Sequence, residues 1–225
     1  FGDVVVVTVN HRLNALGYMD LSDYGEDYQY SGNCGTADLV ASLKWVKENI
    51  ANFGGDPDNV TIFGQSGGGC KVLNMFATSE AEGLFDQAVV QSGGEGHIDQ
   101  DIAKKVTAKT LEILGISDNE VEQLKEVPYD TLDAAATEAQ KQVGEELGTS
   151  VGWSPVLDED YLHTDFLDWT NDVPVMVGSV FGEMNCWTAL DPNETNKNSW
   201  TEEEVDAKLT EKYGDKAEAV KAAFL

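Results

Sequence analysis

Basic residues are scarce in this chain. Only 14 residues are lysine or arginine, against 41 aspartates and glutamates, and the formal net charge is −27. Arg12 is the single arginine, so the chain has few side chains that could bind a phosphate or carboxylate through two parallel hydrogen bonds. A surface this acidic repels phosphate backbones and anionic lipid head groups. We therefore expect no nucleic-acid partner and no membrane partner.

Residues that form disulfides and metal sites are also few. The cysteines, Cys34, Cys70 and Cys186, are widely spaced and contain no C-x-x-C pair, which predicts reduced thiols and not a disulfide framework. The three histidines are scattered and form no H-E-x-x-H motif. We expect no metal and no cofactor. Unpaired thiols favour a cytoplasmic location over secretion.

Long apolar runs are missing as well. The valine-rich segment 4–9 is long enough for a strand but not for a membrane span. With 225 residues and 41% hydrophobic residues, the chain is large enough for one domain that buries about 70% of its unfolded surface.

Segments of strand character alternate with segments of helical spacing, which is typical of βαβ units and a parallel sheet. A glycine- and aspartate-rich loop, 10–35, follows the first strand. The expected strands are 4–9, 59–63, 88–91 and 173–178, and the expected helices are 36–51, 70–76, 102–114, 130–143 and 202–224.

The sequence Gly-Gln-Ser-Gly-Gly at 64–68 lies between an expected strand and an expected helix. A serine at the tip of such a turn has a strained backbone, so the residues two before and two after it must be small to let the neighbouring backbone pass. Gly64 and Gly68 meet this requirement. The N–H of Gly67 is placed to bind the oxyanion of a tetrahedral intermediate. The motif predicts that Ser66 is the nucleophile of an ester- or amide-cleaving enzyme.

A longer pattern surrounds this motif. Asn-His-Arg-Leu at 10–13, the continuous stretch 45–66, Gln-Ser-Gly at 91–93 and the segment 178–183 together resemble the type-B carboxylesterases, a family that includes the cholinesterases. The resemblance implies a partial α/β-hydrolase fold, the central part of a mostly parallel sheet with flanking and cap helices. The sequence departs from the usual family residues at His11, Gln65 and Gly67, where the family has Tyr, Glu and Ala.

The nucleophile needs a histidine base and an acid that orients it, in the chain order Ser, Asp or Glu, then His. The resemblance aligns Glu183 with the family's acid. Asp158 is the second candidate, although its position is typical of a structural turn.

No histidine follows Glu183, so the base is predicted to lie outside this chain. His97 lies just after a strand and is a weaker alternative, although it precedes the acid. His11 belongs to a segment that the resemblance assigns to structure, and His163 is interpreted as a surface residue.

The second oxyanion donor of the fold comes from a loop upstream of the first expected strand. The resemblance places the strand that carries this loop between strands 4–9 and 59–63, so both would have unpaired edges without it. We interpret residues 1–225 as a single partial α/β-hydrolase domain, an internal fragment that lacks the N-terminal strands and the C-terminal part with the catalytic histidine. Alone it is expected to be inactive.

The resulting function is a serine carboxylic-ester hydrolase that acts through an acyl-enzyme on small, apolar esters. The alternative is a non-catalytic adhesion or scaffold protein of the cholinesterase-like kind, since a fold does not dictate a function. A peptidase or lipase with the same motif is a third option. The oligomeric state does not follow from the sequence.

Overall fold

The computed structural model describes residues 2–180, 182–183 and 200–224. Contacts divide the chain into two compact units, Phe1–Ser179 and Val180–Leu225, and each is described by itself. In the described residues, no helix combines the length and apolarity that a membrane crossing requires. The expectation of one partial domain stays a prediction.

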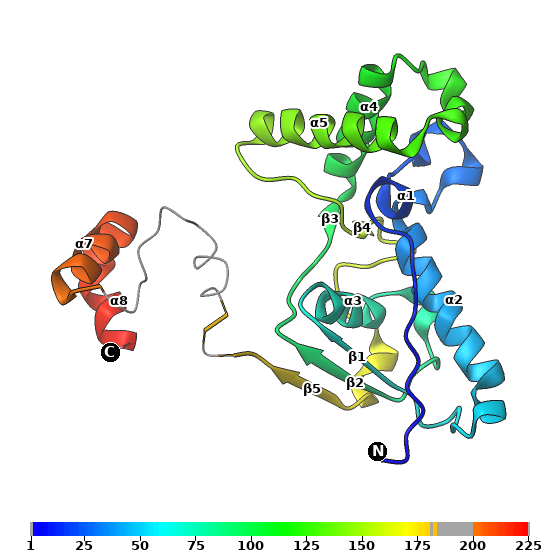
Figure 1. The fold of residues 1–225 in the computed structure, drawn as a ribbon, viewed down its shortest axis with the longest axis horizontal. Coiled ribbons are helices and arrows are strands. Elements are labelled where there is room, and N and C mark those ends of the chain that lie inside the picture. Colours follow the sequence, from blue (N-terminus) through cyan, green and yellow to red (C-terminus); the bar gives the residue numbers. More distant parts are fainter. Residues whose placement is uncertain (1, 181, 184–199, 225) are drawn as a thin grey trace. The chain divides into compact units, whose positions relative to one another are not determined.

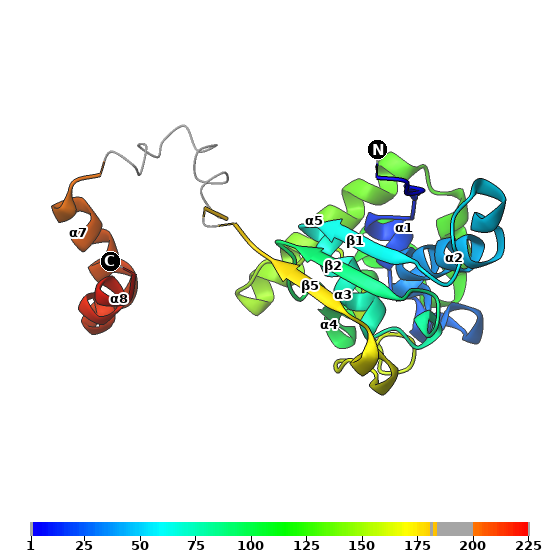
Figure 2. The same cartoon turned by 90° about the horizontal axis from the view of Figure 1, so that it is seen from below.

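A three-stranded parallel sheet forms the centre of the first unit. Its strands are β1 (Thr61–Gln65), β2 (Gln87–Gln91) and β5 (Val175–Gly178), in the order β1-β2-β5. Phe63 pairs with Val89, and Val89 pairs with Met176. The predicted parallel sheet is confirmed, and its three strands run side by side in Figure 2.

Helices follow the expected segments with boundaries shifted by a few residues. Figure 1 shows α4 and α5 packed side by side, apart from the sheet. The α4 helix begins where the Asp99 carboxylate accepts a hydrogen bond from the Asp101 N–H, and it ends at Gly115 with a φ of 69°. The helices are α1 (Asn14–Tyr18), α2 (Cys34–Asn49), α3 (Gly67–Phe76), α4 (Gln100–Leu114) and α5 (Tyr129–Leu147).

The expected loop 10–35 is more ordered than the sequence predicts. It contains α1 and three short 3₁₀ turns, Ser22–Tyr24, Glu26–Tyr28 and Ser31–Asn33. A second small sheet was also missed, because two-residue strands have no readable alternation. Its strands β3 (Ile98–Asp99) and β4 (Val156–Leu157) pair in parallel.

The main core lies between α3, α2 and the sheet. Val72, Met75 and Phe76 of α3 are almost fully buried and pack in one cluster with Ala88 and Val90 of β2. Figures 1 and 2 show α3 along one face of the sheet. Because this packing fixes the start of α3 against the end of β1, the core determines the geometry of the turn between them.

The expected strand at 4–9 is wrong. These residues form no strand, and Val4 and Val6 are 69% and 65% exposed. A strand obtains its backbone hydrogen bonds from a neighbour, and no described strand lies beside this segment. Among the described residues β1 is an edge strand, and its Phe63 is exposed. The expected neighbouring strand from outside this sequence stays a prediction.

The second unit contains a helical pair, α7 (Glu202–Tyr213) and α8 (Ala217–Phe224), joined by the 3₁₀ turn Gly214–Lys216. A capping box of Thr201 and Glu204 starts α7. Lys221 of α8 binds the carboxylates of Glu202 and Asp206. The predicted helical stretch 202–224 is therefore confirmed, with one break.

Candidate active site

Ser66 joins the end of β1 to the start of α3 in an uncommon backbone conformation. Its φ is 55° and its ψ is −121°, a region that a residue with a Cβ enters only when the surroundings enforce it. The Ser66 N–H donates to the Gln91 carbonyl at 2.9 Å, and the Ser66 carbonyl accepts from the Cys70 N–H at 3.0 Å. The turn is thus held to β2 on one side and to α3 on the other, and Ser66 is exposed.

The strained turn is possible because β1 and α3 approach each other closely at Gly64. A Cβ on Gly64 would lie 2.3 Å from both the carbonyl carbon and the oxygen of Gly68. The matching expectation for Gly68 is wrong within the described residues, since a Cβ there would meet nothing within 4 Å. The close contact involves the backbone of Gly68, so only the side chain of Gly64 is restricted.

A second close approach fixes the other side of α3. A Cβ on Gly93 would lie 2.6 Å from the carbonyl carbon of Gly69, in the first turn of the helix. The residue before it, Ser92, also has a positive φ of 50°, and its N–H donates to the Gly178 carbonyl at 2.7 Å. The first turn of α3 is therefore wedged between the carboxyl ends of β1 and β2.

Gly67 is the first residue of α3. An N–H in the first turn of a helix has no carbonyl partner within that helix and lies at the positive end of the helix dipole. Lys71, one turn later, places its ammonium nitrogen 3.4 Å from the Gly67 carbonyl oxygen. The N-terminal end of the α3 dipole and the Lys71 ammonium thus place positive charge near Gly67, the residue next to Ser66. The role of Gly67 as an oxyanion donor stays a prediction.

Glu183 belongs to the second unit, where its carboxylate accepts a hydrogen bond of 2.8 Å from the Val180 N–H. Its predicted role as the orienting acid stays a prediction. Cys186 lies outside the described residues, whereas Cys34 and Cys70 are free thiols.

Two of the three histidines have partners other than Ser66. The Nε2 of His163 lies 2.7 Å from the Ser79 hydroxyl, and the Nδ1 of His11 lies 2.9 Å from the Arg12 carbonyl. In the part of the chain that the structure describes, no hydrogen bond joins Ser66 to any histidine, His97 included. The absence of a base from this chain stays a prediction.

Asp158 has the structural role that its position suggests. One of its carboxylate oxygens accepts hydrogen bonds from the N–H groups of Asp160, Tyr161 and Leu162. The other accepts from the amide of Asn33, which is fully buried. Three backbone donors on one oxygen define a turn, and the Asn33 amide occupies the other oxygen, so the described contacts of Asp158 are structural.

Two polar contacts that sequence reasoning missed hold the segment before α2 in place. The guanidinium and the backbone N–H of Arg12 bind the Asp38 carboxylate at 2.7 to 2.9 Å, and the guanidinium holds the pKa of Asp38 below its usual range. Asn33 exchanges hydrogen bonds with the backbone of Val156. Both pairs are far apart in sequence, so no local signal marks them.

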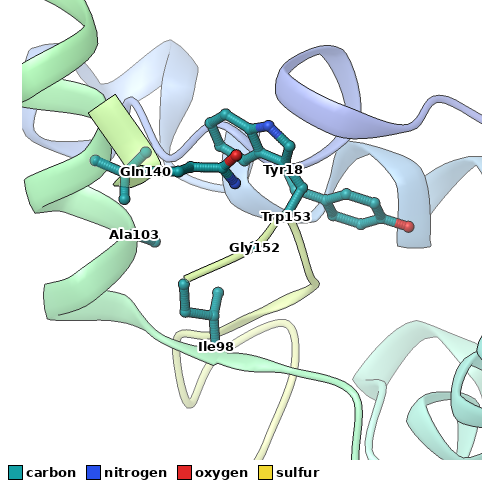
Figure 3. A pocket seen from close by; sticks show the side chains of 7 residues that line it. Tyr18, Ile98, Ala103, Gln140, Gly152 and Trp153 are labelled. Atoms are coloured by element: carbon teal, nitrogen blue, oxygen red, sulfur yellow. The ribbon is translucent and has the colours of Figure 1, made fainter. Parts of the chain in front are cut away.

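The space between α4, α5 and β3 is filled by side chains and is part of the protein core. Figure 3 shows side chains from α1, β3, α4 and α5 around Trp153, and the space between them does not admit a water molecule. Burial raises the pKa of Tyr18, which lines this space, to about 12. The space is therefore no ligand site, and Ser66 does not line it.

A parallel sheet whose strand ends in a strained serine and continues into a helix defines the α/β-hydrolase class. The sequence matches the carboxylesterase family over residues 1–224. The chain belongs to this family, as the sequence resemblance predicted.

Three relatives illustrate the match. The chain is 43% identical to the para-nitrobenzyl esterase of Bacillus subtilis over 135 residues, which is 60% of this chain and 27% of that protein. It is 44% identical, with a TM-score of 0.78, to the structure of a Clostridium hathewayi esterase described as able to hydrolyse aliphatic aromatic polyesters, covering 99% of this chain and 45% of that one. Mouse neuroligin-2 is 46% identical over 94 residues, which is 41% of this chain and 11% of that protein. The chain thus spans less than half the length of these relatives.

Proposed function

We propose that the protein containing this chain is a serine carboxylic-ester hydrolase that works through an acyl-enzyme on Ser66. The observation that carries the proposal is the exposed serine with a φ of 55° at the junction of β1 and α3. Backbone strain of this kind costs about 1–3 kcal/mol, persists only where the surrounding structure enforces it, and is concentrated at active sites and binding sites.

In the proposed reaction the Ser66 oxygen attacks the ester carbonyl while a histidine takes its proton. The Gly67 N–H donates to the developing oxyanion, assisted by the dipole of α3. The alcohol then leaves with that proton, and water releases the acid from the acyl-enzyme by the reverse sequence. We propose that Glu183 orients the histidine, and that the histidine comes from a part of the protein beyond this sequence.

The proposed substrates are small, apolar esters. The chain has one arginine, and Arg12 is already bound to Asp38, so it supplies no arginine for an anionic substrate. Lys71 is the described cation nearest in sequence to the serine, and it lies against the Gly67 carbonyl.

Fluorophosphonate labelling and hydrolysis of a chromogenic acetate ester test the proposal on the full-length protein. Ser66→Ala is expected to abolish labelling and to lower kcat by roughly 10⁵-fold or more. Ser79→Ala is the matched control, because Ser79 is a serine that does contact a histidine, His163. Labelling that survives Ser66→Ala, or that disappears in Ser79→Ala, contradicts the assignment.

An adhesion or scaffold protein is the second candidate, favoured by the neuroligin-2 match. Such a protein needs no nucleophile, so it gives no reason for the strain at Ser66. A properly folded full-length protein that neither labels nor turns over any short-chain ester would favour this alternative.

A further inference from the structure

Charged residues are almost absent from the segments that form the main sheet and the turn at Ser66. Segments 59–79, 87–94 and 173–179 contain β1 with α3, then β2, then β5. They include one charged residue, Lys71, in a chain in which 24% of the residues are charged and the net charge is −27. The charge next to the candidate nucleophile is therefore opposite in sign to that of the chain as a whole.

Lys71 lies one helical turn after Gly67, on the same face of α3. Its ammonium nitrogen is 3.4 Å from the Gly67 carbonyl oxygen and 3.9 Å from the position that a Cβ on Gly67 would occupy. A Cα–Cβ bond adds about 1.5 Å, and the Cα atoms of neighbouring residues are about 3.8 Å apart. The ammonium thus lies at most about 9 Å from the Cα of Ser66.

No carboxylate neutralises Lys71 in the part of the chain that the structure describes. Its hydrogen bond is to the neutral Gly67 carbonyl. Glu80, the acid nearest to it in sequence, is bound to Lys44 instead. Glu95, the first acid after β2, is exposed and forms no ion pair with Lys71 among the described residues. The charge of Lys71 therefore acts on its surroundings over about one Debye length, roughly 10 Å at 0.1 M salt.

This charge acts differently on esters of different charge. The ammonium repels a cationic group that approaches Ser66 and attracts an anionic group, and it leaves a neutral apolar group unaffected. For a substrate charge about 9 Å away, at an effective dielectric constant of about 40 to 80, Coulomb's law gives roughly a twofold to fivefold change in rate. The net charge of the whole chain acts in the opposite direction, since an acidic protein attracts cations.

We propose that Lys71 is a specificity-determining residue that disfavours cationic esters at Ser66. An ester with a positive group close to its carbonyl carbon reacts more slowly than its neutral isostere, because the group must approach the ammonium. The inference rests on the proposed esterase function and narrows its substrate class by excluding cationic esters. It requires no direct hydrogen bond between Lys71 and the substrate, because the interaction is Coulombic.

Three acetate esters of similar size test this inference on the full-length protein at low ionic strength. They are the neutral 3,3-dimethylbutyl acetate, its cationic isostere 2-(trimethylammonio)ethyl acetate, and the anionic 2-sulfoethyl acetate. A pH-stat measures the acetic acid that each ester releases. The kcat/KM of each charged ester is divided by that of the neutral ester, so that a general change in folding or catalysis cancels.

Lys71→Met removes the charge and keeps an unbranched side chain of similar helix propensity. We expect the cation-to-neutral ratio of kcat/KM to rise roughly twofold to fivefold, and the anion-to-neutral ratio to fall by the same factor. Lys71→Arg keeps the charge and should keep both ratios. Lys71→Gln removes the same charge and replaces Lys71→Met if that variant does not fold.

Lys105→Met is the matched control, because it changes the net charge equally. Lys105 is exposed on α4, which Figure 1 shows apart from the sheet, so this substitution should leave both ratios unchanged. Ratios in Lys71→Met equal to those of the parent would overturn the inference. Equal changes in Lys71→Met and Lys105→Met would also overturn it, because they would mean a diffuse effect of net charge.

Fluorophosphonate labelling separates the failure of this inference from the failure of the proposed function. If the parent labels at Ser66 and the ratios do not depend on Lys71, the specificity role is wrong and the esterase function stands. A folded parent that neither labels nor hydrolyses the neutral ester overturns both.

Discussion

Replacing Gly64 by alanine should loosen the turn that carries Ser66. The new Cβ would lie 2.3 Å from two backbone atoms of Gly68 and 2.9 Å from a third, whereas carbon atoms normally approach to about 3.5 Å. Both sides of this contact are backbone, so no side chain can rotate away. β1 and the first turn of α3 must therefore separate by about 1 Å.

The expected cost follows from that geometry. Overpacking in a well-packed region costs about 1–3 kcal/mol, and the rigid backbone on both sides puts Gly64→Ala at the upper end, about 3 kcal/mol. Gly68→Ala is the matched control, because its Cβ meets nothing within 4 Å and a helical glycine gains about 0.5–1 kcal/mol on becoming alanine. The free energies of unfolding of the two variants should thus differ by more than about 3 kcal/mol.

Urea denaturation of the full-length protein measures both free energies of unfolding, and the rate of fluorophosphonate labelling reports the geometry of Ser66. Gly64→Ala should unfold at lower urea and label more slowly, while Gly68→Ala should match or exceed the parent in stability. Equal stability of Gly64→Ala and the parent would refute the steric argument. Equal destabilisation by the two substitutions would show that the turn tolerates no added side chain, whatever its contacts.

Two further predictions concern the contacts around α2. Asn33→Leu should destabilise the protein by about 3 kcal/mol, measured by urea denaturation, because it leaves the buried backbone N–H and C=O of Val156 without their partner. Asp38 has a pKa lowered by Arg12, so it stabilises the folded state fully above its unfolded pKa of about 3.9, and that contribution disappears as the pH falls through its lower folded pKa. Asp38→Asn should therefore lose less stability than the parent between about pH 5 and pH 2, and parallel curves of stability against pH would contradict this.

The local sequence pattern was sufficient to predict an element where that element is long or where its residues are chemically distinctive. The helices α2, α4 and α5 were predicted from the spacing of apolar residues, and the parallel sheet from the alternation of strands and helices. The turn at Ser66 was predicted because small residues around a serine between strand and helix serve few other purposes.

The local sequence pattern gave wrong or missing predictions where the structure of a segment depends on another segment that is close in space but distant in sequence. Residues 4–9 have strand composition but form no strand, since hydrogen bonds to another strand define one. The two-residue strands β3 and β4 were too short to show a period. The contact between Asn33 and Val156 was not foreseen, because the two residues are 123 positions apart along the chain.

The sequence by itself determined the family, the parallel character of the sheet and the identity of the candidate nucleophile, because these depend on residue types at short, regular spacings. Only the tertiary structure decided that Gly64 and not Gly68 is sterically restricted, and that Asp158 closes a turn. Those features depend on distances between segments that the folded core brings together, and no local pattern encodes such distances.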